Sequence, residues 1–255
     1  MTLHVETFGA GPALVLLHGW GMHSGVWHEF AQRLAQHHRV TLIDLPGHGR
    51  SVTFPTPYAL ATVTQAVLEH APPNAHWLGW SLGGLIAQHA AHHAPERVAK
   101  LVLLASTPQF VRSADWPHAM DPDVLMQFFT ELQRDHRATL LIFLALEVQG
   151  SAAARIELRA LRERIFAHGE PQGAALTGGL NILRDSNLRA QFAALRQPVL
   201  ALLGSHDRLV PAEVAPDLTR LLPQAITHFI AGAGHAPFLS QPALCAQRVT
   251  EFLHE

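Results

Sequence analysis

Hydrophobic positions along the chain form short, nearly continuous apolar runs separated by segments with helical spacing. The runs cover residues 13–19, 40–47, 76–81, 101–107, 199–207 and 228–235, and each ends in glycine or a polar residue. A strand that is apolar on both faces must be covered on both, as in a parallel sheet with crossover helices. Residues 3–9 predict a leading antiparallel strand.

The segments between the apolar runs predict helices over residues 25–37, 58–70, 82–93, 212–222 and 240–254. Several of these segments end near glycine or proline, which stop helices. The alternation of strands and helices predicts an α/β fold with a mostly parallel sheet and helices on both of its faces.

One long region, 109–185, breaks the alternation because it has helical periods, as over 123–135 and 152–166, and no strand signal. It is too long for an ordinary loop. Insertions at the carboxyl edge of a parallel sheet lie over the place where such folds bind ligands. We therefore predict a core made of residues 1–108 and 186–255, with 109–185 inserted as a helical lid.

Composition narrows the classes of protein. The chain is 48% hydrophobic and 15% charged, which is typical of a well-packed globular protein. A net charge of −2 gives no reason to expect a nucleic-acid partner. The one cysteine, Cys245, excludes an internal disulfide and fits a reducing compartment. Because no signal peptide or membrane-length apolar run is visible, we expect a cytoplasmic protein without a membrane partner.

The candidate nucleophile is Ser81. Residues 79–83 read G-x-S-x-G, directly after a predicted strand and at the start of a predicted helix. In that context the motif forms a strained turn that raises the serine oxygen above the sheet, and a Cβ at Gly79 or Gly83 would collide across the turn. The alternative is a serine that only caps the helix.

A serine hydroxyl needs a base, and the base needs a group that orients it. In strand–turn–helix sites of this kind the chain order is serine, acid, histidine. Asp207 and His235 follow two of the last predicted strands in that order, at the same sheet edge as Ser81. We expect His235 to move the serine proton and Asp207 to hold the His235 tautomer.

Other polar residues could compete for these roles. We expect His206 to be a surface residue and His18 to support the oxyanion loop. Asp44 should brace the turn that follows it, and Asp185 should cap a helix. The histidine pairs at 37–38 and 92–93 have no carboxylate or cysteine that completes a ligand set, so we expect surface histidines and no metal.

A hydrolytic site also needs donors for the oxyanion. One is the backbone N–H of Leu82, directly after the nucleophile, and the other is the N–H of Trp20 in the loop after an early strand. The Trp20 indole should also form a wall of the substrate pocket. The alternative is an aromatic side chain that serves only the core.

Several segments together resemble one family. They read LLHGWGM, LIDLPGHGRS, LGWSLGGLIA, FLALE, GGLNIL and HAPFLSQP. They are similar to the BioH family of pimeloyl-[acyl-carrier protein] methyl ester esterases. The resemblance implies an α/β-hydrolase fold with a helical lid, no cofactor, and hydrolysis of the methyl ester of pimeloyl-[acyl-carrier protein] in biotin synthesis. The implied substrate contacts are Trp20, Ser81, Leu82, Phe143 and His235.

The predicted lid helix at 152–166 has two stripes. Leu158, Leu161 and Ile165 share one face and should pack inward, which leaves Arg155, Arg159 and Arg162 facing outward.

The family docks its acidic carrier protein on the lid, and the match covers Arg155 and Arg159, with Arg162 extending it. Just before Phe143, where the family has further basic residues, only Arg137 remains. The alternative is a solvated face balanced by Glu157 and Glu163.

Other functions share these motifs. A carbon–carbon bond hydrolase, a lactonase or a broad carboxylesterase for small-molecule esters would differ only in the lid. A dehalogenase or epoxide hydrolase is disfavoured because it would need aspartate at position 81. A non-catalytic small-molecule receptor could keep the same fold, although the intact serine, acid and histidine argue against it.

Overall fold

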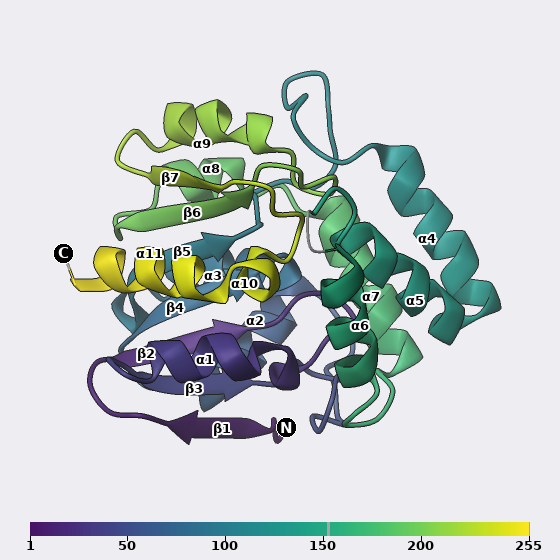
Figure 1. Ribbon diagram of the computed structural model, residues 1–255, viewed down its shortest axis with the longest axis horizontal. Coiled ribbons are helices and arrows are strands. Elements are labelled where there is room, and N and C mark those ends of the chain that lie inside the picture. The colour runs from purple at the N-terminus through teal and green to yellow at the C-terminus, as the bar shows by residue number, and fades with distance from the viewer. Residues whose placement is uncertain (152–153, 255) are drawn as a thin grey trace.

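The computed structural model describes residues 1–151 and 154–254 and contains a seven-stranded sheet in the order β1-β3-β2-β4-β5-β6-β7 (Figure 1). β1 (Val5–Phe8) runs antiparallel to β3 (Arg39–Ile43). The remaining pairs are parallel and join β2 (Ala13–Leu17), β3, β4 (Ala75–Trp80), β5 (Val98–Leu104), β6 (Val199–Gly204) and β7 (Ile226–Ile230). All seven predicted strands are confirmed, but each ends earlier than predicted. The polar residues after the six parallel strands therefore lie in loops at the carboxyl edge of the sheet.

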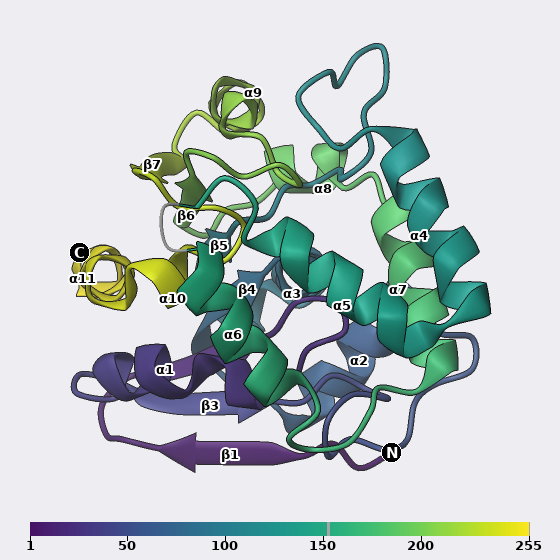
Figure 2. The ribbon, with the colours of Figure 1, turned by 45° about the vertical axis from the view of Figure 1, so that its right-hand side comes forward.

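Helices cover both faces of the sheet, as predicted. The 3-10 helix η1 (Ser24–Trp27), α1 (His28–Leu34), α10 (Pro237–Ser240) and α11 (Pro242–His254) lie on one face, and α2 (Leu60–His70) and α3 (Leu82–His93) lie on the other (Figures 1 and 2). The shorter connecting helices are η2 (Pro95–Arg97), α8 (Arg189–Ala193), η3 (Ala212–Val214) and α9 (Ala215–Leu221). The sequence did not predict α8, because five residues are too few for a periodic signal.

Of the five helices described between β5 and β6, four lie beyond the carboxyl ends of the parallel strands (Figure 2). They are α4 (Pro122–Arg134), α5 (His136–Glu147), α6 (Ala154–Ile165) and α7 (Gly173–Asp185). The side chains of Asp121 and Asp135 cap α4 and α5 by accepting backbone N–H bonds. Residues 152–153, which begin the predicted helix at 152–166, lie outside the described residues.

The core runs from the sheet into the contact with these helices. Five tryptophans are fully buried: Trp20, Trp27, Trp77, Trp80 and Trp116. Every residue of β6, and all but the first residues of β2 and β3, is buried, as a sheet covered on both faces requires. Within residues 1–151 and 154–254, no helix is both long enough and apolar enough to cross a bilayer.

Candidate active site

Ser81 lies in the tight turn between β4 and α3. Its backbone is in the left-handed half of the Ramachandran plot, with φ 53° and ψ −118°, a conformation that costs a residue with a side chain about 1–3 kcal/mol. A Cβ added at Gly79 would meet the Gly83 carbonyl, and one added at Gly83 would meet the Leu17 carbonyl. The requirement for glycine at both positions is therefore confirmed, and it is steric.

The turn is held from β5. The Ser81 N–H donates to the Leu104 carbonyl at 3.1 Å, and the Ser106 hydroxyl donates to the Ser81 carbonyl at 2.8 Å. Because both bonds involve backbone atoms of Ser81, its hydroxyl remains available to another partner. Ser106 was missed in the sequence, where nothing distinguishes it from a loop serine.

The structure brings the three residues of the predicted triad together. The His235 Nε2 lies 2.9 Å from the Ser81 Oγ, and the His235 Nδ1 lies 2.7 Å from the Asp207 Oδ2. This arrangement fits a histidine that donates from Nδ1 to the carboxylate and accepts the serine proton at Nε2. The exposed fractions of Ser81, Asp207 and His235 are 2%, 5% and 1%, so all three residues are shielded from bulk water.

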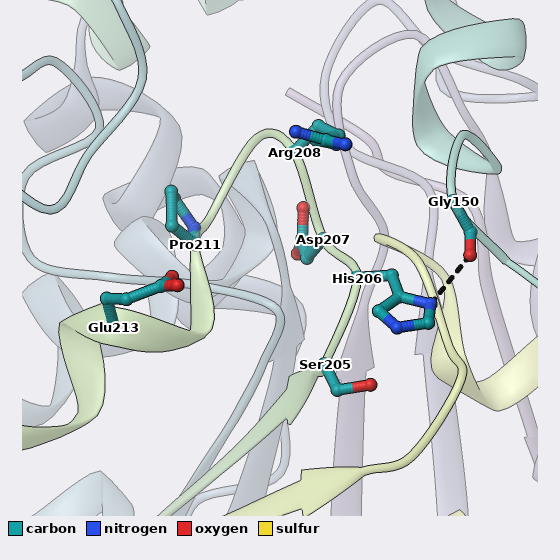
Figure 3. Close-up of a pocket in the computed structure, with 7 residues that line it drawn as sticks. All are labelled: Gly150, Ser205, His206, Asp207, Arg208, Pro211 and Glu213. Atoms are coloured by element: carbon teal, nitrogen blue, oxygen red, sulfur yellow. Dashed lines mark hydrogen bonds between the residues drawn. The ribbon is translucent and has the colours of Figure 1, made fainter.

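Asp207 is oriented by its own loop. Its Oδ1 accepts the N–H groups of Leu209 at 2.8 Å and Val210 at 3.0 Å, which leaves Oδ2 for His235. Figure 3 shows Asp207 on this loop, beyond the end of β6, among residues that line a surface pocket of about 480 Å³. One side of the acid loop therefore faces the histidine and the other faces solvent.

The backbone of His235 is fixed at both its polar atoms. The Trp80 Nε1 donates to the His235 carbonyl at 2.8 Å, and the His235 N–H donates to the Glu147 carbonyl at 2.8 Å. Trp80 is also packed edge-on against Phe238, directly after the base loop, with ring centroids 5.0 Å apart. The sequence did not reveal either partner, because both contacts join positions far apart in the chain.

The two predicted oxyanion donors lie in the loop after β2 and at the first residue of α3. Within residues 1–151 and 154–254, the backbone N–H groups of Trp20 and Leu82 donate no hydrogen bond. A free N–H at the first turn of a helix is normal and suits it to bind an anion. Both groups are therefore available to a ligand at Ser81.

The Trp20 indole connects the site to the helices α4, α5 and α7, which form part of the predicted lid. Its Nε1 donates to the Leu176 carbonyl of α7 at 2.8 Å, and its ring packs edge-on against Phe143 of α5 with centroids 4.9 Å apart. Phe143 in turn contacts Phe128 of α4 at 5.4 Å. A series of aromatic contacts thus runs from the loop after β2 through two of these helices, α5 and α4, and the indole hydrogen bond adds a third, α7.

His18 and Asp44 hold the loops around the site, as expected. The His18 Nε2 accepts the Leu45 N–H at 2.9 Å, and its Nδ1 lies 2.8 Å from the Gly19 carbonyl, which ties the oxyanion loop to the end of β3. The Asp44 carboxylate accepts the N–H groups of Ser24 at 2.6 Å and Arg50 at 2.9 Å. Burial lowers the pKa of His18 far below its ordinary value, so it stays neutral.

Two expectations about other polar residues were wrong. Asp185 does not cap a helix: it is the last residue of α7, where a carboxylate has no free N–H to accept, and it pairs instead with Arg184 at 2.7 and 2.8 Å. His38 is fully buried, because it stacks on His254 of α11 with centroids 5.5 Å apart. His206 is exposed, as expected, and its Nδ1 lies 2.8 Å from the Gly150 carbonyl.

The α6 stripes are largely as predicted. Leu161 and Ile165 are buried and Leu158 is half-buried, while Arg155, Arg159 and Arg162 are exposed. Arg159 pairs with Glu163 at 2.8 Å.

In the alternative of a solvated face, Glu157 and Glu163 would balance the arginines, and for Glu157 the structure contradicts that alternative. Glu157 is buried, with an exposed fraction of 2%, and accepts a hydrogen bond from the Ser151 hydroxyl. Within the described ranges, no group of three histidine, cysteine or acidic side chains is placed to hold a metal ion.

The fold and the site together define a class of protein. A serine raised on a strand–turn–helix, followed along the chain by its acid and its histidine, occurs in α/β-hydrolases. The family model of the alpha/beta hydrolase fold matches residues 12–242. The chain therefore belongs to that family. A hydrolase from Pseudomonas aeruginosa PA01 has a similar structure, with a TM-score of 0.82 at 26% identity over 99% of this chain and 94% of the other.

Sequence similarity narrows the family further. The chain is 48% identical to the pimeloyl-[acyl-carrier protein] methyl ester esterase of Xanthomonas oryzae pv. oryzae (strain MAFF 311018), over 98% of both chains. It is also 48% identical to the protein of the same name from Xylella fastidiosa (strain M23), over 93% of both chains. The chain is thus a member of the pimeloyl-[acyl-carrier protein] methyl ester esterase family.

Proposed function

We propose that this protein is a serine carboxylesterase that hydrolyses the methyl ester of pimeloyl-[acyl-carrier protein] to pimeloyl-[acyl-carrier protein] and methanol, a step of biotin biosynthesis. The observation that carries the hydrolase chemistry is the bonded series Ser81–His235–Asp207. The assignment of the substrate rests on the 48% identity to esterases of that name across almost the full chain. We place this reaction in the cytoplasm, the compartment that the sequence predicts.

In the first half of the reaction, the Ser81 Oγ attacks the ester carbonyl while the His235 Nε2 takes the serine proton. Asp207 stabilises the imidazolium that forms. The N–H groups of Trp20 and Leu82 hold the tetrahedral oxyanion. Collapse of this intermediate breaks the bond to the methoxy group, which leaves as methanol with the proton from His235.

In the second half, His235 takes a proton from water, and the resulting hydroxide attacks the acyl-enzyme carbonyl. The same two N–H groups hold the second oxyanion, and the proton returns to the Ser81 oxygen as the acid is released. No step requires a metal or an organic cofactor. Phe143, packed on the Trp20 indole, would contact the acyl chain of the substrate at the lid side of the site.

A burst experiment tests the enzymatic assignment. With a short-chain p-nitrophenyl ester, the wild-type protein should release a burst of p-nitrophenol equal to the amount of enzyme, because this good leaving group makes acylation faster than the attack of water on the acyl-enzyme. Ser81→Ala should remove the burst. A receptor that keeps the fold without catalysis would bind the ester and release no p-nitrophenol, and this result would refute the proposal.

The lid supplies a surface for the carrier protein. Arg155, Arg159 and Arg162 lie on the exposed face of α6. Arginine forms bidentate bonds with phosphate and carboxylate groups, which suits an acidic carrier with a phosphate in its prosthetic group. In our proposal the stripe steers the carrier protein and binds that phosphate, while the ester end of the acyl chain reaches Ser81.

Charge reversal separates docking from chemistry. Arg155→Glu with Arg159→Glu should raise KM for the carrier-bound methyl ester several-fold, with an effect that weakens at high salt. Hydrolysis of a p-nitrophenyl ester should hardly change. A matched control makes the same change at Arg134 on α4 and Arg248 on α11, which are also exposed. Equal losses on both substrates, or none on either, would show that the stripe is only solvated.

A further inference from the structure

Glu147 is a buried acid to which the reaction mechanism above assigns no role. It is the last residue of α5 and has an exposed fraction of 0%. Neither of its carboxyl oxygens has a hydrogen-bond partner in the part of the chain that the structure describes. A buried carboxylate without partners is very costly, so a protein keeps such a group neutral or gives it a function.

The end of α5 is bonded to both loops that carry the acid and the base. The Glu147 carbonyl accepts the His235 N–H at 2.8 Å. Three residues later, the Gly150 carbonyl lies 2.8 Å from the Nδ1 of His206, the residue before Asp207 (Figure 3). The approach is close, since a Cβ added at Gly234 would lie 2.9 Å from the Glu147 carbonyl.

The electrostatic environment of Glu147 favours its proton. Burial, with a further contribution from the Asp207 carboxylate, raises the pKa of Glu147 well above its ordinary value. The titratable or charged groups on the segments that meet this end of α5 are Asp207, His206 and Arg208 after β6, His235 after β7, and Glu157 on α6. Both burial and the neighbouring Asp207 side chain thus favour the protonated form of Glu147.

We propose that Glu147 is a positioning residue for the base: its carbonyl holds the His235 loop, and its side chain must stay uncharged for that contact to persist. This inference rests on the proposed function, because it acts through His235. A proton lost from Glu147 would leave an unpartnered charge in a fully buried position. Gly150, three residues later in the chain, lines a surface pocket of about 480 Å³, and a charged Glu147 would draw the end of α5 toward that opening.

The test is the pH dependence of kcat for a small ester. The wild-type protein should lose activity at alkaline pH as Glu147 ionises and His235 loses its backbone hydrogen bond. Glu147→Gln has the same shape and cannot ionise, so it should keep activity near the wild-type value at neutral pH and extend it by at least about one pH unit on the alkaline side. Glu147→Met serves if the glutamine variant does not fold, since the carboxyl oxygens have no partner to lose.

The matched control is Glu157→Gln, which removes another buried lid acid and should leave the alkaline limb where it is in the wild type. Equal alkaline limbs in the wild type and both Glu147 variants, or a wild type without such a limb, would overturn the proposal. Failure of the proposed function is a different result, because it would appear at neutral pH as activity that survives Ser81→Ala.

Discussion

At the residue scale, a small set of hydrogen bonds fixes the orientation of Asp207 and His235, the proposed acid and base. Asp207 gives one oxygen to two backbone N–H groups and the other to His235. His235 is in turn fixed at its N–H and its carbonyl. The proposed acid and base are therefore each held in one orientation in the absence of substrate, which is the condition for a large contribution from preorganisation.

Substitution of the three proposed triad residues should lower kcat by large and unequal factors. Ser81→Ala and His235→Ala should each lower kcat by several orders of magnitude with the fold intact, because the three groups act as a unit. Asp207→Asn should lower kcat by about 10⁴, since the amide favours the wrong histidine tautomer. Steady-state kinetics with a p-nitrophenyl ester measure these losses.

Asp44→Asn is the control for the acid. The Asp44 carboxylate accepts hydrogen bonds from the backbone N–H groups of Ser24 and Arg50. Asp44→Asn should therefore lower the free energy of unfolding and have only a small effect on kcat. If Asp44→Asn lowered kcat more than Asp207→Asn at unchanged stability, the acid would be misassigned.

The site residues that the sequence predicts are marked by local patterns, whereas those that it does not predict depend on contacts between distant parts of the chain. Ser81, Asp207 and His235 lie at ends of strands that local periodicity predicts, in an order that the fold fixes. Trp80 and Glu147 contact His235 across long stretches of chain, and no local pattern encodes such a pairing. The alternative of a solvated face treats Glu157 only as a charge, and nothing in the local sequence shows that it is buried against Ser151.

At the element scale, the turn between β4 and α3 positions Ser81 at the carboxyl edge of the sheet. Predicted and observed helix bounds agree completely for α3, residues 82–93, because the glycine turn fixes its start and Pro95 lies just after its end. Boundaries were less well predicted where tertiary contacts decide them. The predicted helix 25–37 divides into η1 and α1, and His38 beyond it is buried by α11.

The same turn predicts a stability defect. Gly83→Ala would place a Cβ against the Leu17 and His18 carbonyls, so it should lower the free energy of unfolding by about 2 kcal/mol or more. Gly169→Ala is the control, because that glycine has φ +92° but nothing within 4 Å of an added Cβ. Gly169→Ala should lower the free energy of unfolding by about 1 kcal/mol, through backbone strain alone. Urea unfolding compares the two, and a smaller loss at Gly83 would contradict the steric argument.

At the scale of the whole molecule, several histidines are folded into the interior without a charge. Burial lowers the pKa of His48 to about 4, and it also lowers the pKa of His18, whose ring centroid lies 5.4 Å from that of His48. Unfolding returns both side chains to water, where their pKa is about 6.5. The unfolded state therefore binds more protons below that pH.

This difference in proton binding predicts acid sensitivity. Between about pH 6.5 and pH 4, each of the two histidines should lower the free energy of unfolding by up to about 1.4 kcal/mol for each pH unit of acidification. His48→Asn should remove the contribution of one histidine from the dependence of the free energy of unfolding on pH. His92→Asn, at an exposed position, should leave that dependence unchanged. Urea unfolding at several pH values gives the slopes, and equal slopes in wild type and His48→Asn would contradict a neutral buried His48.

The most direct test of the central claim is mass spectrometry of the carrier protein after incubation of methyl-pimeloyl-[acyl-carrier protein] with the purified enzyme. We predict that the wild type removes the mass of one methylene group from the loaded carrier, as a methyl ester becomes an acid, and leaves the thioester intact. Ser81→Ala should leave the mass unchanged. Release of the whole pimeloyl group, an unchanged carrier with the wild type, or equal conversion by Ser81→Ala would contradict the account.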